Sequence, residues 1–207
     1  DIPIPPTRYE DLSSKPAAQI AYKYSYYSGY GVQRAVQRLY ESNEQEYRNL
    51  YYRMHLEVDD PLDMVRKAVI TDGSREKIIF RTSDHGDLLG AHGGLHQKWF
   101  NLYDEATRVP FEIVKYGGAQ SPKAVIDSVP TSHVDLIPTA LALAGLDQNY
   151  LGEHLAPQFS EFHPLPGRDL SPLLEDPGIS EFKNRAVYFM TRDNMLEGDT
   201  LASAMAR

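Results

Sequence analysis

Residues 77–110 read KIIFRTSDHGDLLGAHGGLHQKWFNLYDEATRVP, and this stretch decides the fold. It opens with the apolar residues Ile78, Ile79 and Phe80. A short apolar run without polar alternation predicts a strand that is buried on both faces, as in parallel sheets. The run ends in Ser-Asp-His-Gly at residues 83–86, and ligand sites of open α/β sheets lie at such strand ends. We therefore expect an α/β fold with a mainly parallel sheet flanked by helices.

The two residues that follow this strand, Asp84 and His85, suggest a metal site. A carboxylate oxygen and a neutral imidazole nitrogen both bind divalent cations, and a turn at Gly86 would direct them to one ion. Lys98 lies fourteen residues after Asp84. Its ammonium group is a compact charge suited to a tetrahedral oxyanion such as sulfate or phosphate. Asp-His-Gly taken alone is more typical of an ordinary turn than of a metal site.

The complete stretch resembles the sulfatase family of the alkaline-phosphatase superfamily. The resemblance is carried by SDHGDLLG at residues 83–90, by His92-Gly93, by Lys98 and by YDEATRVP at residues 103–110. It implies that Asp84 and His85 are metal ligands, and that Lys98 contacts the sulfate group or the leaving-group oxygen. The distance from Asp84 to Lys98 is one residue longer than the commonest family spacing.

The resemblance also implies a reaction and its cofactors. We expect a segment of a sulfuric ester hydrolase that cleaves a sulfate monoester, with Ca²⁺ as the favoured metal and Mn²⁺ as the alternative. Sulfatases use a formylglycine made from Cys or Ser in a C/S-x-P-x-R motif, and this chain has no cysteine and no such motif. We therefore expect the nucleophile in the remainder of the sulfatase polypeptide. Residues 1–185 would form the C-terminal half of the catalytic core, and residues 186–207 the start of a smaller subdomain.

Two other functions stay open at this point. The same superfamily contains phosphonate monoester and phosphodiester hydrolases, which also use an Asp-His pair. Alternatively, the segment is a non-catalytic piece that is inactive on its own, because the nucleophile and part of the metal site are missing from its sequence.

Composition narrows the classes of partner. The chain has 207 residues and a net charge of −8, which argues against nonspecific nucleic-acid binding. No apolar run approaches the roughly 20 residues that span a bilayer. We expect a soluble chain; the sequence does not identify its compartment, although a cytoplasmic location is favoured.

Other polar residues near Lys98 need separate interpretations. His96 is a candidate for substrate binding, because it lies two residues before Lys98. The resemblance implies that His92 is not a metal ligand, and we interpret it as structural. Glu105 and Arg108 are predicted to form an internal ion pair that steadies the loop.

The remaining patterns predict secondary structure. Apolar residues at steps of three and four predict a helix over 43–72 that packs on the sheet, with a kink or break at Pro61. Strands are predicted at 110–116, 123–129 and 186–190. A helix is predicted within 131–145, with Asp135 as its N-cap and Gly145 as its C-terminal cap. The tyrosines within residues 17–40 are predicted to form a packed aromatic face.

Overall fold

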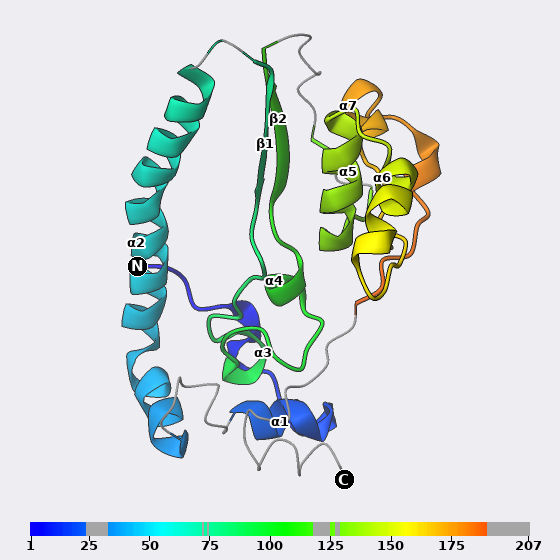
Figure 1. Ribbon diagram of the computed structural model, residues 1–207. Helices are drawn as coiled ribbons and strands as arrows, with labels where there is room; N and C mark the ends of the chain where they lie inside the picture. The colour runs from blue at the N-terminus through cyan, green and yellow to red at the C-terminus, as the bar shows by residue number, and fades with distance from the viewer. Residues whose placement is uncertain (24–32, 72, 74, 118–124, 127–128, 190–207) are drawn as a thin grey trace. The chain divides into compact units, whose positions relative to one another are not determined.

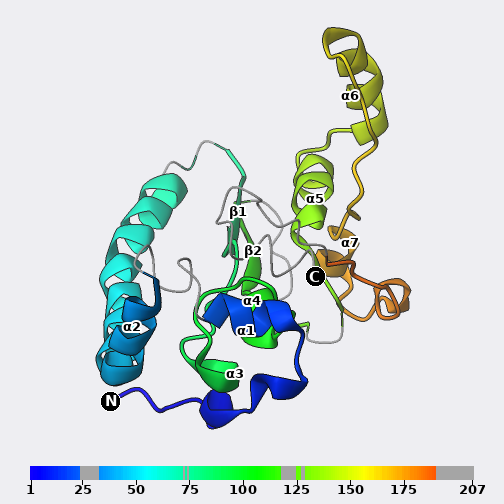
Figure 2. The same cartoon turned by 90° about the horizontal axis from the view of Figure 1, so that it is seen from below.

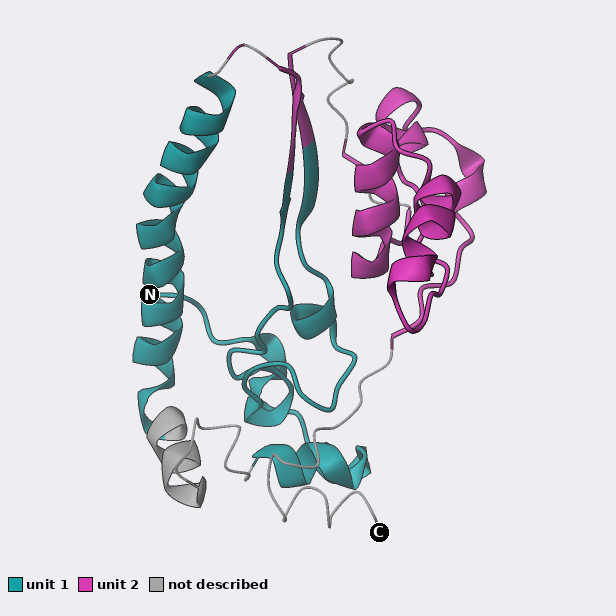
Figure 3. Cartoon of the chain, viewed as in Figure 1, with its two compact units in different colours: residues 1–72, 80–113, 190–207 teal, residues 73–79, 114–189 magenta. Residues whose placement is uncertain are grey.

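A computed structural model describes residues 1–23, 33–71, 73, 75–117, 125–126 and 129–189 of the chain. The chain divides into two compact units (Figure 3). Unit 1 comprises Asp1–Asp72, Phe80–Ile113 and Met190–Arg207, and unit 2 comprises Gly73–Ile79 and Val114–Phe189. Helices and a two-stranded sheet together give the α/β composition that was predicted.

Along the chain, one long helix and two strands are accompanied by short helices and 3₁₀ turns. The 3₁₀ turns and helices are η1 (Pro6–Tyr9), η2 (Leu12–Ser14), α1 (Ala17–Lys23), α2 (Gln33–Thr71), α3 (Ala91–Gly94), α4 (Asp104–Thr107), η4 (His133–Asp135), α5 (Leu136–Leu143), α6 (Gln148–Leu155), η5 (Ala156–Gln158), α7 (Pro172–Glu175) and η6 (Ser180–Phe182). The strands are β1 (Lys77–Thr82) and β2 (Phe111–Tyr116). A predicted strand at 123–129 lies mostly outside the described residues.

The long helix α2 differs from its prediction in where it bends (Figure 1). The helix runs through Pro61 without a break, and its non-helical backbone is at Asn43, with φ −128° and ψ 25°. The prediction of a kink or break at Pro61 was therefore wrong. Proline removes one backbone donor. The residues around Pro61 are exposed, so the freed carbonyl faces solvent and not a dry core.

The apolar stripe of α2 is exposed over much of its length. Exposed fractions are 55% at Met54, 57% at Leu62 and 63% at Val65. The predicted packing of this stripe on a sheet is not observed among the described residues. A helix of this length with an uncovered apolar face is typical of a surface that another part of a protein covers.

The sheet contains β1 and β2, which run antiparallel (Figure 1). The rings of Phe80 and Phe111 stack with centroids 6.4 Å apart, and Arg81 pairs with Glu112 at 3.2 Å. The first four residues of β1 are half-buried and the last two are exposed. The predicted burial of β1 on both faces is not seen. The predicted mainly parallel sheet is not seen among the described residues either, because the strand that pairs with β1 there is antiparallel.

The core of unit 1 holds the loop that follows β1. Leu12, Tyr22, Leu88, Leu95 and Ala106 are all less than 9% exposed and form one cluster. Tyr22 from α1 also donates its hydroxyl to the His96 carbonyl at 3.2 Å. For this tyrosine the packed aromatic face is observed, whereas Tyr24, Tyr26, Tyr27 and Tyr30 lie outside the described residues. The loop that carries Lys98 is thereby fixed to the N-terminal segment of the chain.

Unit 2 is organised around the fully buried side chain of Asp135. Its carboxylate accepts hydrogen bonds from the backbone amides of Ser132 and Arg168, both at 2.8 Å. It accepts two more from the Arg185 guanidinium, at 2.7 and 2.9 Å. Burial alone would raise the pKa of Asp135, but these hydrogen bonds outweigh burial and lower it. Asp135 is the N-cap residue of α5, as predicted.

The two ends of the second predicted helix and the last predicted strand can also be compared. Gly145 has φ 72°, the left-handed conformation expected of a C-terminal cap. Residues 186–189 form no strand, so the prediction of a strand at 186–190 was wrong for its described part. A strand requires a hydrogen-bonded neighbour, and β1 and β2 pair with each other among the described residues.

Candidate active site

The turn after β1 is shaped by a close approach of α4. The Gly86 amide donates to the Ala106 carbonyl at 2.9 Å. A Cβ at Gly86 would lie 1.9 Å from the Glu105 backbone oxygen, so no larger residue fits without displacing backbone. The strand therefore ends in a turn whose position is fixed by α4, and Asp84 and His85 immediately precede it.

The side chains of Asp84, His85 and Lys98 meet at this turn. His85 Nε2 lies 3.1 Å from Asp84 Oδ2 and 2.6 Å from Lys98 Nζ. The Asp84 carboxylate is 82% exposed, and the His85 side chain is 36% exposed. The His85 amide donates to Asp84 Oδ1 at 2.9 Å, and this bond lowers the pKa of Asp84. The structure thus brings together three of the four candidate site residues, and the fourth, His96, lies elsewhere.

The imidazole of His85 has a defined orientation. Its Nδ1 lies 2.9 Å from the Gly86 carbonyl, and because a carbonyl only accepts, Nδ1 carries a proton. In the neutral ring the lone pair is then on Nε2, the nitrogen that faces Asp84 and Lys98. A carboxylate oxygen and an imidazole lone pair on one side of a turn fit a divalent cation. The Lys98 ammonium, itself a cation, lies within hydrogen-bond distance of the same lone pair.

This pair falls short of a complete metal centre. Among the described ranges, no group of three or more His, Cys, Asp or Glu side chains is arranged to hold a metal ion. Ca²⁺ takes six to eight oxygen ligands and Mg²⁺ six. Two donors of this chain can therefore supply only part of a coordination sphere.

The loop between Asp84 and Lys98 is held in an unusual backbone conformation. In the described part of the chain four non-glycine residues have positive φ, between 48° and 61°, and all lie within residues 89–100: Leu89, His92, Gln97 and Phe100. The half-buried Asp87 carboxylate accepts hydrogen bonds from the backbone amides of Leu89, at 2.8 Å, and Gln97, at 3.0 Å. Burial raises the pKa of Asp87 despite these bonds. Such strained positions persist only when surrounding contacts impose them, and they cluster at functional sites.

His96 is buried in the core of unit 1, with 1% of its surface exposed. Its ring packs edge-on against Tyr47, with centroids 5.3 Å apart. Burial, with the nearby charges of Arg8, Arg48 and Lys23, lowers the pKa of His96 to about 4. The structure therefore does not place this candidate substrate residue on the exposed surface that Asp84 occupies.

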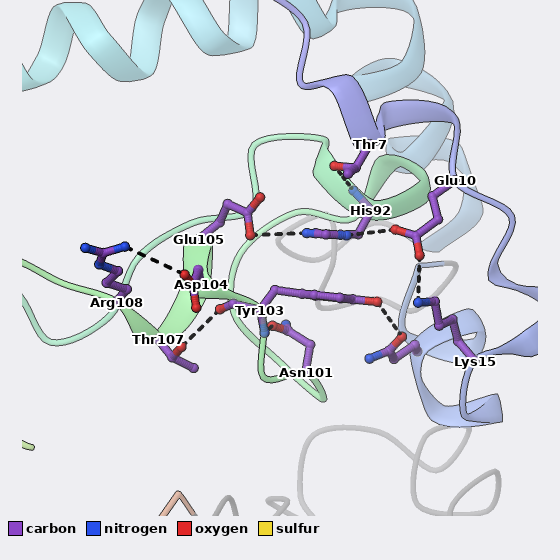
Figure 4. Close-up of polar contacts among 11 residues, drawn as sticks. Thr7, Glu10, Lys15, His92, Asn101, Tyr103, Asp104, Glu105, Thr107 and Arg108 are labelled. Atoms are coloured by element: carbon purple, nitrogen blue, oxygen red, sulfur yellow. Dashed lines mark hydrogen bonds and ion pairs between the residues drawn. The ribbon is translucent and has the colours of Figure 1, made fainter. Parts of the chain in front are cut away.

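His92 lies in a polar network that sequence reasoning missed (Figure 4). Its ring lies between Glu10 and Glu105, and it stacks on Tyr103 with centroids 3.5 Å apart. Arg108 pairs instead with Asp104, at 3.9 Å. The predicted Glu105–Arg108 ion pair was therefore wrong, because the Glu105 carboxylate points to His92. No local signal in the sequence marks Glu10 as the second partner of His92, since Glu10 and His92 are 82 residues apart.

Comparisons with known proteins also find sulfatases. The family model described as Sulfatase matches residues 10–146. The chain is 32% identical over 136 residues to the uncharacterized sulfatase YidJ of Escherichia coli strain K12. The aligned residues cover 66% of this chain and 24% of that protein. It is 37% identical over 109 residues to arylsulfatase K of Danio rerio, with 51% of this chain and 20% of the relative covered.

A third relative is the delta 4,5-hexuronate-2-O-sulfatase of Bacteroides thetaiotaomicron, 34% identical over 111 residues, with 50% of this chain and 22% of the relative covered. The matched part of the chain therefore spans between a fifth and a quarter of the length of these relatives. No solved structure matches the chain at a significant level. Every helix in the described ranges is too short or too polar to cross a lipid bilayer.

Proposed function

The chain belongs to the sulfatase family, and we propose that it is the segment of a sulfuric ester hydrolase that supplies Asp84, His85 and Lys98 to the active site. The observation that carries the proposal is the meeting of these three side chains at the end of β1. A carboxylate, an imidazole lone pair and an ammonium group are the groups needed to hold a cation and an oxyanion side by side.

In this proposal Asp84 and His85 hold a divalent cation, with Ca²⁺ favoured and Mn²⁺ as the alternative. When bound, the metal would act as a Lewis acid toward the sulfate oxygens. The His85 Nδ1–H bond to the Gly86 carbonyl fixes the ring so that the Nε2 lone pair is on the side of Asp84 and Lys98. The remaining ligands and a formylglycine nucleophile would come from the remainder of the sulfatase polypeptide.

Lys98 has the complementary role toward the substrate. Its ammonium group would neutralise sulfate charge or stabilise the leaving oxygen of the sulfate ester. His85 and Lys98 face each other at 2.6 Å, so an oxyanion bound by Lys98 would lie next to the cation bound by His85. Because Lys98 Nζ lies at the Nε2 lone pair, the lysine side chain would shift when a cation binds there.

The same proposal accounts for the apolar surfaces that remain uncovered. We infer that β1 joins a larger, mainly parallel sheet, and that the exposed stripe of α2 packs on it. Residues 1–185 would then form the C-terminal half of the catalytic core, and residues 186–207 the start of a smaller subdomain. The partner in this assembly is the rest of a sulfatase polypeptide.

One observation favours a second candidate function. Because the described residues offer two ligands and not three, the segment alone would be a non-catalytic piece. The two candidates differ in the behaviour of a protein that contains this chain together with a C/S-x-P-x-R segment. Under the first, hydrolysis of an aryl sulfate depends on Ca²⁺ and is lost in Asp84→Ala. Hydrolysis that is unchanged in Asp84→Ala would refute the site assignment.

The metal-binding part of the proposal can be tested on the 207-residue chain by calorimetric titration with Ca²⁺. We expect Asp84→Asn to weaken binding at least tenfold, because a neutral amide replaces the carboxylate ligand. The matched control is Asp104→Asn, since both carboxylates are largely exposed, at 82% and 79%. Equal affinity in the two variants would contradict a site at Asp84.

A further inference from the structure

The imidazole of His92 connects two distant segments of unit 1 (Figure 4). Its Nδ1 lies 2.8 Å from Glu10 Oε2, and its Nε2 lies 3.1 Å from Glu105 Oε2. Glu10 immediately follows η1, Glu105 lies in α4, and His92 belongs to the loop that carries Lys98. Three segments are therefore joined through one ring that is 13% exposed.

The chemistry of these contacts specifies the protonation of the ring. An ionised carboxylate only accepts hydrogen bonds, and a neutral imidazole donates from one nitrogen alone. Both contacts are hydrogen bonds only when both ring nitrogens carry protons. The charges agree with this, because Glu10 is also paired with Lys15 at 2.6 Å, and a positive His92 balances the remaining carboxylate of Glu105. The hydrogen bonds from Lys15 and then His92 lower the pKa of Glu10 and keep it ionised.

The face of the ring supports the same reading. His92 and Tyr103 are parallel within 3°, with centroids 3.5 Å apart. Lys15 also lies over the Tyr103 ring, with Nζ 5.8 Å from its centroid. The face of an aromatic ring carries negative charge and attracts cations. Among the described residues, Glu10, Glu105, Tyr103 and Lys15 are the charged or titratable side chains in contact with this network. The two carboxylates and the face of the Tyr103 ring favour a cation at His92, and the opposing charge of Lys15 is offset by its pair with Glu10.

The backbone at His92 needs such a restraint. His92 has φ 48°, a left-handed conformation that is unfavourable for an L-residue with a side chain. Its amide donates to Thr7 Oγ1 at 3.1 Å. At the next residue, Gly93, a Cβ would lie 2.7 Å from Leu12. The loop is therefore pressed onto the segment around η1 at the point where the His92 ring is clamped.

The clamp is linked to the proposed site through α4. The Glu105 backbone oxygen abuts Gly86, and the Gly86 amide donates to Ala106, the residue after Glu105. Gly86 directly follows His85, whereas Lys98 is at the other end of the loop that His92 anchors. Movement of either Glu105 or the loop would change the separation of His85 and Lys98.

We propose that His92 is a positioning residue that, with both ring nitrogens protonated, clamps the loop between Glu10 and Glu105 and so holds Lys98 beside His85. The clamp itself follows from the contacts of His92; its effect on catalysis rests on the proposed sulfatase function. In this role His92 touches neither metal nor substrate.

The protonation of the ring is tested by the histidine ¹⁵N spectrum of the 207-residue chain, which distinguishes the doubly protonated ring from either neutral tautomer. We expect a doubly protonated His92 ring at pH 6, because its two nitrogens face Glu10 and Glu105. A His92 ring that is a single neutral tautomer at pH 6 would overturn the proposal.

The clamp is tested by hydrogen exchange of two loop amides, Gly90 and Leu95, which donate to Leu95 and Ala91 carbonyls at 2.8 and 2.9 Å. We expect Glu10→Gln and Glu105→Gln each to lower their protection factors about tenfold, the equivalent of one charged hydrogen bond. In a His92→Gln background Glu105→Gln should have no further effect, whereas Glu10→Gln should keep only the effect of losing its separate pair with Lys15. An undiminished effect of Glu105→Gln in that background would overturn the clamp.

A control variant separates the clamp from simple packing of a histidine ring. His92→Gln should lower the protection factors of Gly90 and Leu95, whereas His154→Gln should leave them unchanged. His154 is the matched control, because that ring also packs on a tyrosine, Tyr150, at 3.9 Å, but is exposed in unit 2. Equal protection in the two variants would contradict the proposal. These measurements involve neither metal nor sulfate, so they distinguish failure of the clamp from failure of the proposed function.

Discussion

At the scale of single residues, His96 makes the stability of unit 1 depend on pH. Burial lowers the pKa of His96 to about 4, from an ordinary value of about 6.5. The unfolded chain therefore binds a proton at this residue at pH values where the folded chain does not. Stability from this source is complete above about pH 6.5 and declines as the pH falls toward 4. The contribution amounts to about 3 kcal/mol over this window.

We expect urea unfolding of the natural chain to show this decline, and His96→Gln to show a flatter dependence between pH 6.5 and 4. His163→Gln is the control, because His163 is 80% exposed. The difference between the natural chain and each variant removes the contributions of all other titrating groups. A pH dependence that is the same in His96→Gln and in the natural chain would show that His96 is not buried in its neutral form.

Gly86 carries a prediction about the turn that precedes the loop. Gly86→Ala places a Cβ 1.9 Å from the Glu105 backbone oxygen, so α4 or the turn must shift. We expect a loss of about 2 kcal/mol in the free energy of unfolding, as for other overpacked sites. The control is Gly73→Ala, where the new methyl group meets nothing within 4 Å. Equal stability of the two variants would contradict the close approach of α4.

At the scale of elements, α5 and the segments around it depend on one buried ion pair. Asp135→Asn leaves the Arg185 guanidinium, which is 7% exposed, without its counter-charge. Removing one partner of a buried pair costs about 3–5 kcal/mol. Asp147→Asn is the matched control, because Asn is as good an N-cap as Asp and the hydrogen bond to Tyr150 can be kept. Thermal unfolding of both variants measures the difference, and similar melting temperatures would refute the assignment.

The same ion pair has a pH dependence. The folded pKa of Asp135 is lowered, so its stabilisation is present above the unfolded value of about 3.9 and is lost as the pH falls through the folded value. We expect the melting temperature of the natural chain to drop below pH 4 more steeply than that of Asp135→Asn. Parallel curves would indicate that Asp135 is not the group responsible.

Elements whose signals are local could be predicted from the sequence. β1 and β2 lie where apolar runs predicted strands, and α5 lies where Asp135 and Gly145 predicted the two ends of a helix. Pro61 was misjudged because the cost of an interior proline depends on the surroundings of the freed carbonyl, which sequence does not give. The strand expected at 186–190 failed for a similar reason, since a strand depends on a neighbour and not on its own residues alone.

At the scale of the whole molecule, the sequence identified the residues of the candidate site but not what supports them. The meeting of Asp84, His85 and Lys98 could be predicted because a strand end and one short loop bring them together. The Glu10–His92–Glu105 network could not, because it joins segments that are far apart in the chain through orientations of side chains. Glu105 was assigned to Arg108 on sequence proximity, and the longer-range contact prevailed.

The most direct test of the central claim is paramagnetic relaxation by Mn²⁺ in an isotope-labelled sample of this chain. Mn²⁺ broadens the signals of nuclei near its binding site, and both the carboxylate and the imidazole are ligands that it accepts. If Asp84 and His85 hold a cation beside Lys98, substoichiometric Mn²⁺ will first broaden the amides around residues 83–87 and 97–99. Broadening that begins elsewhere, for example at the acidic residues Asp59, Asp60 and Asp63 of α2, would contradict the site.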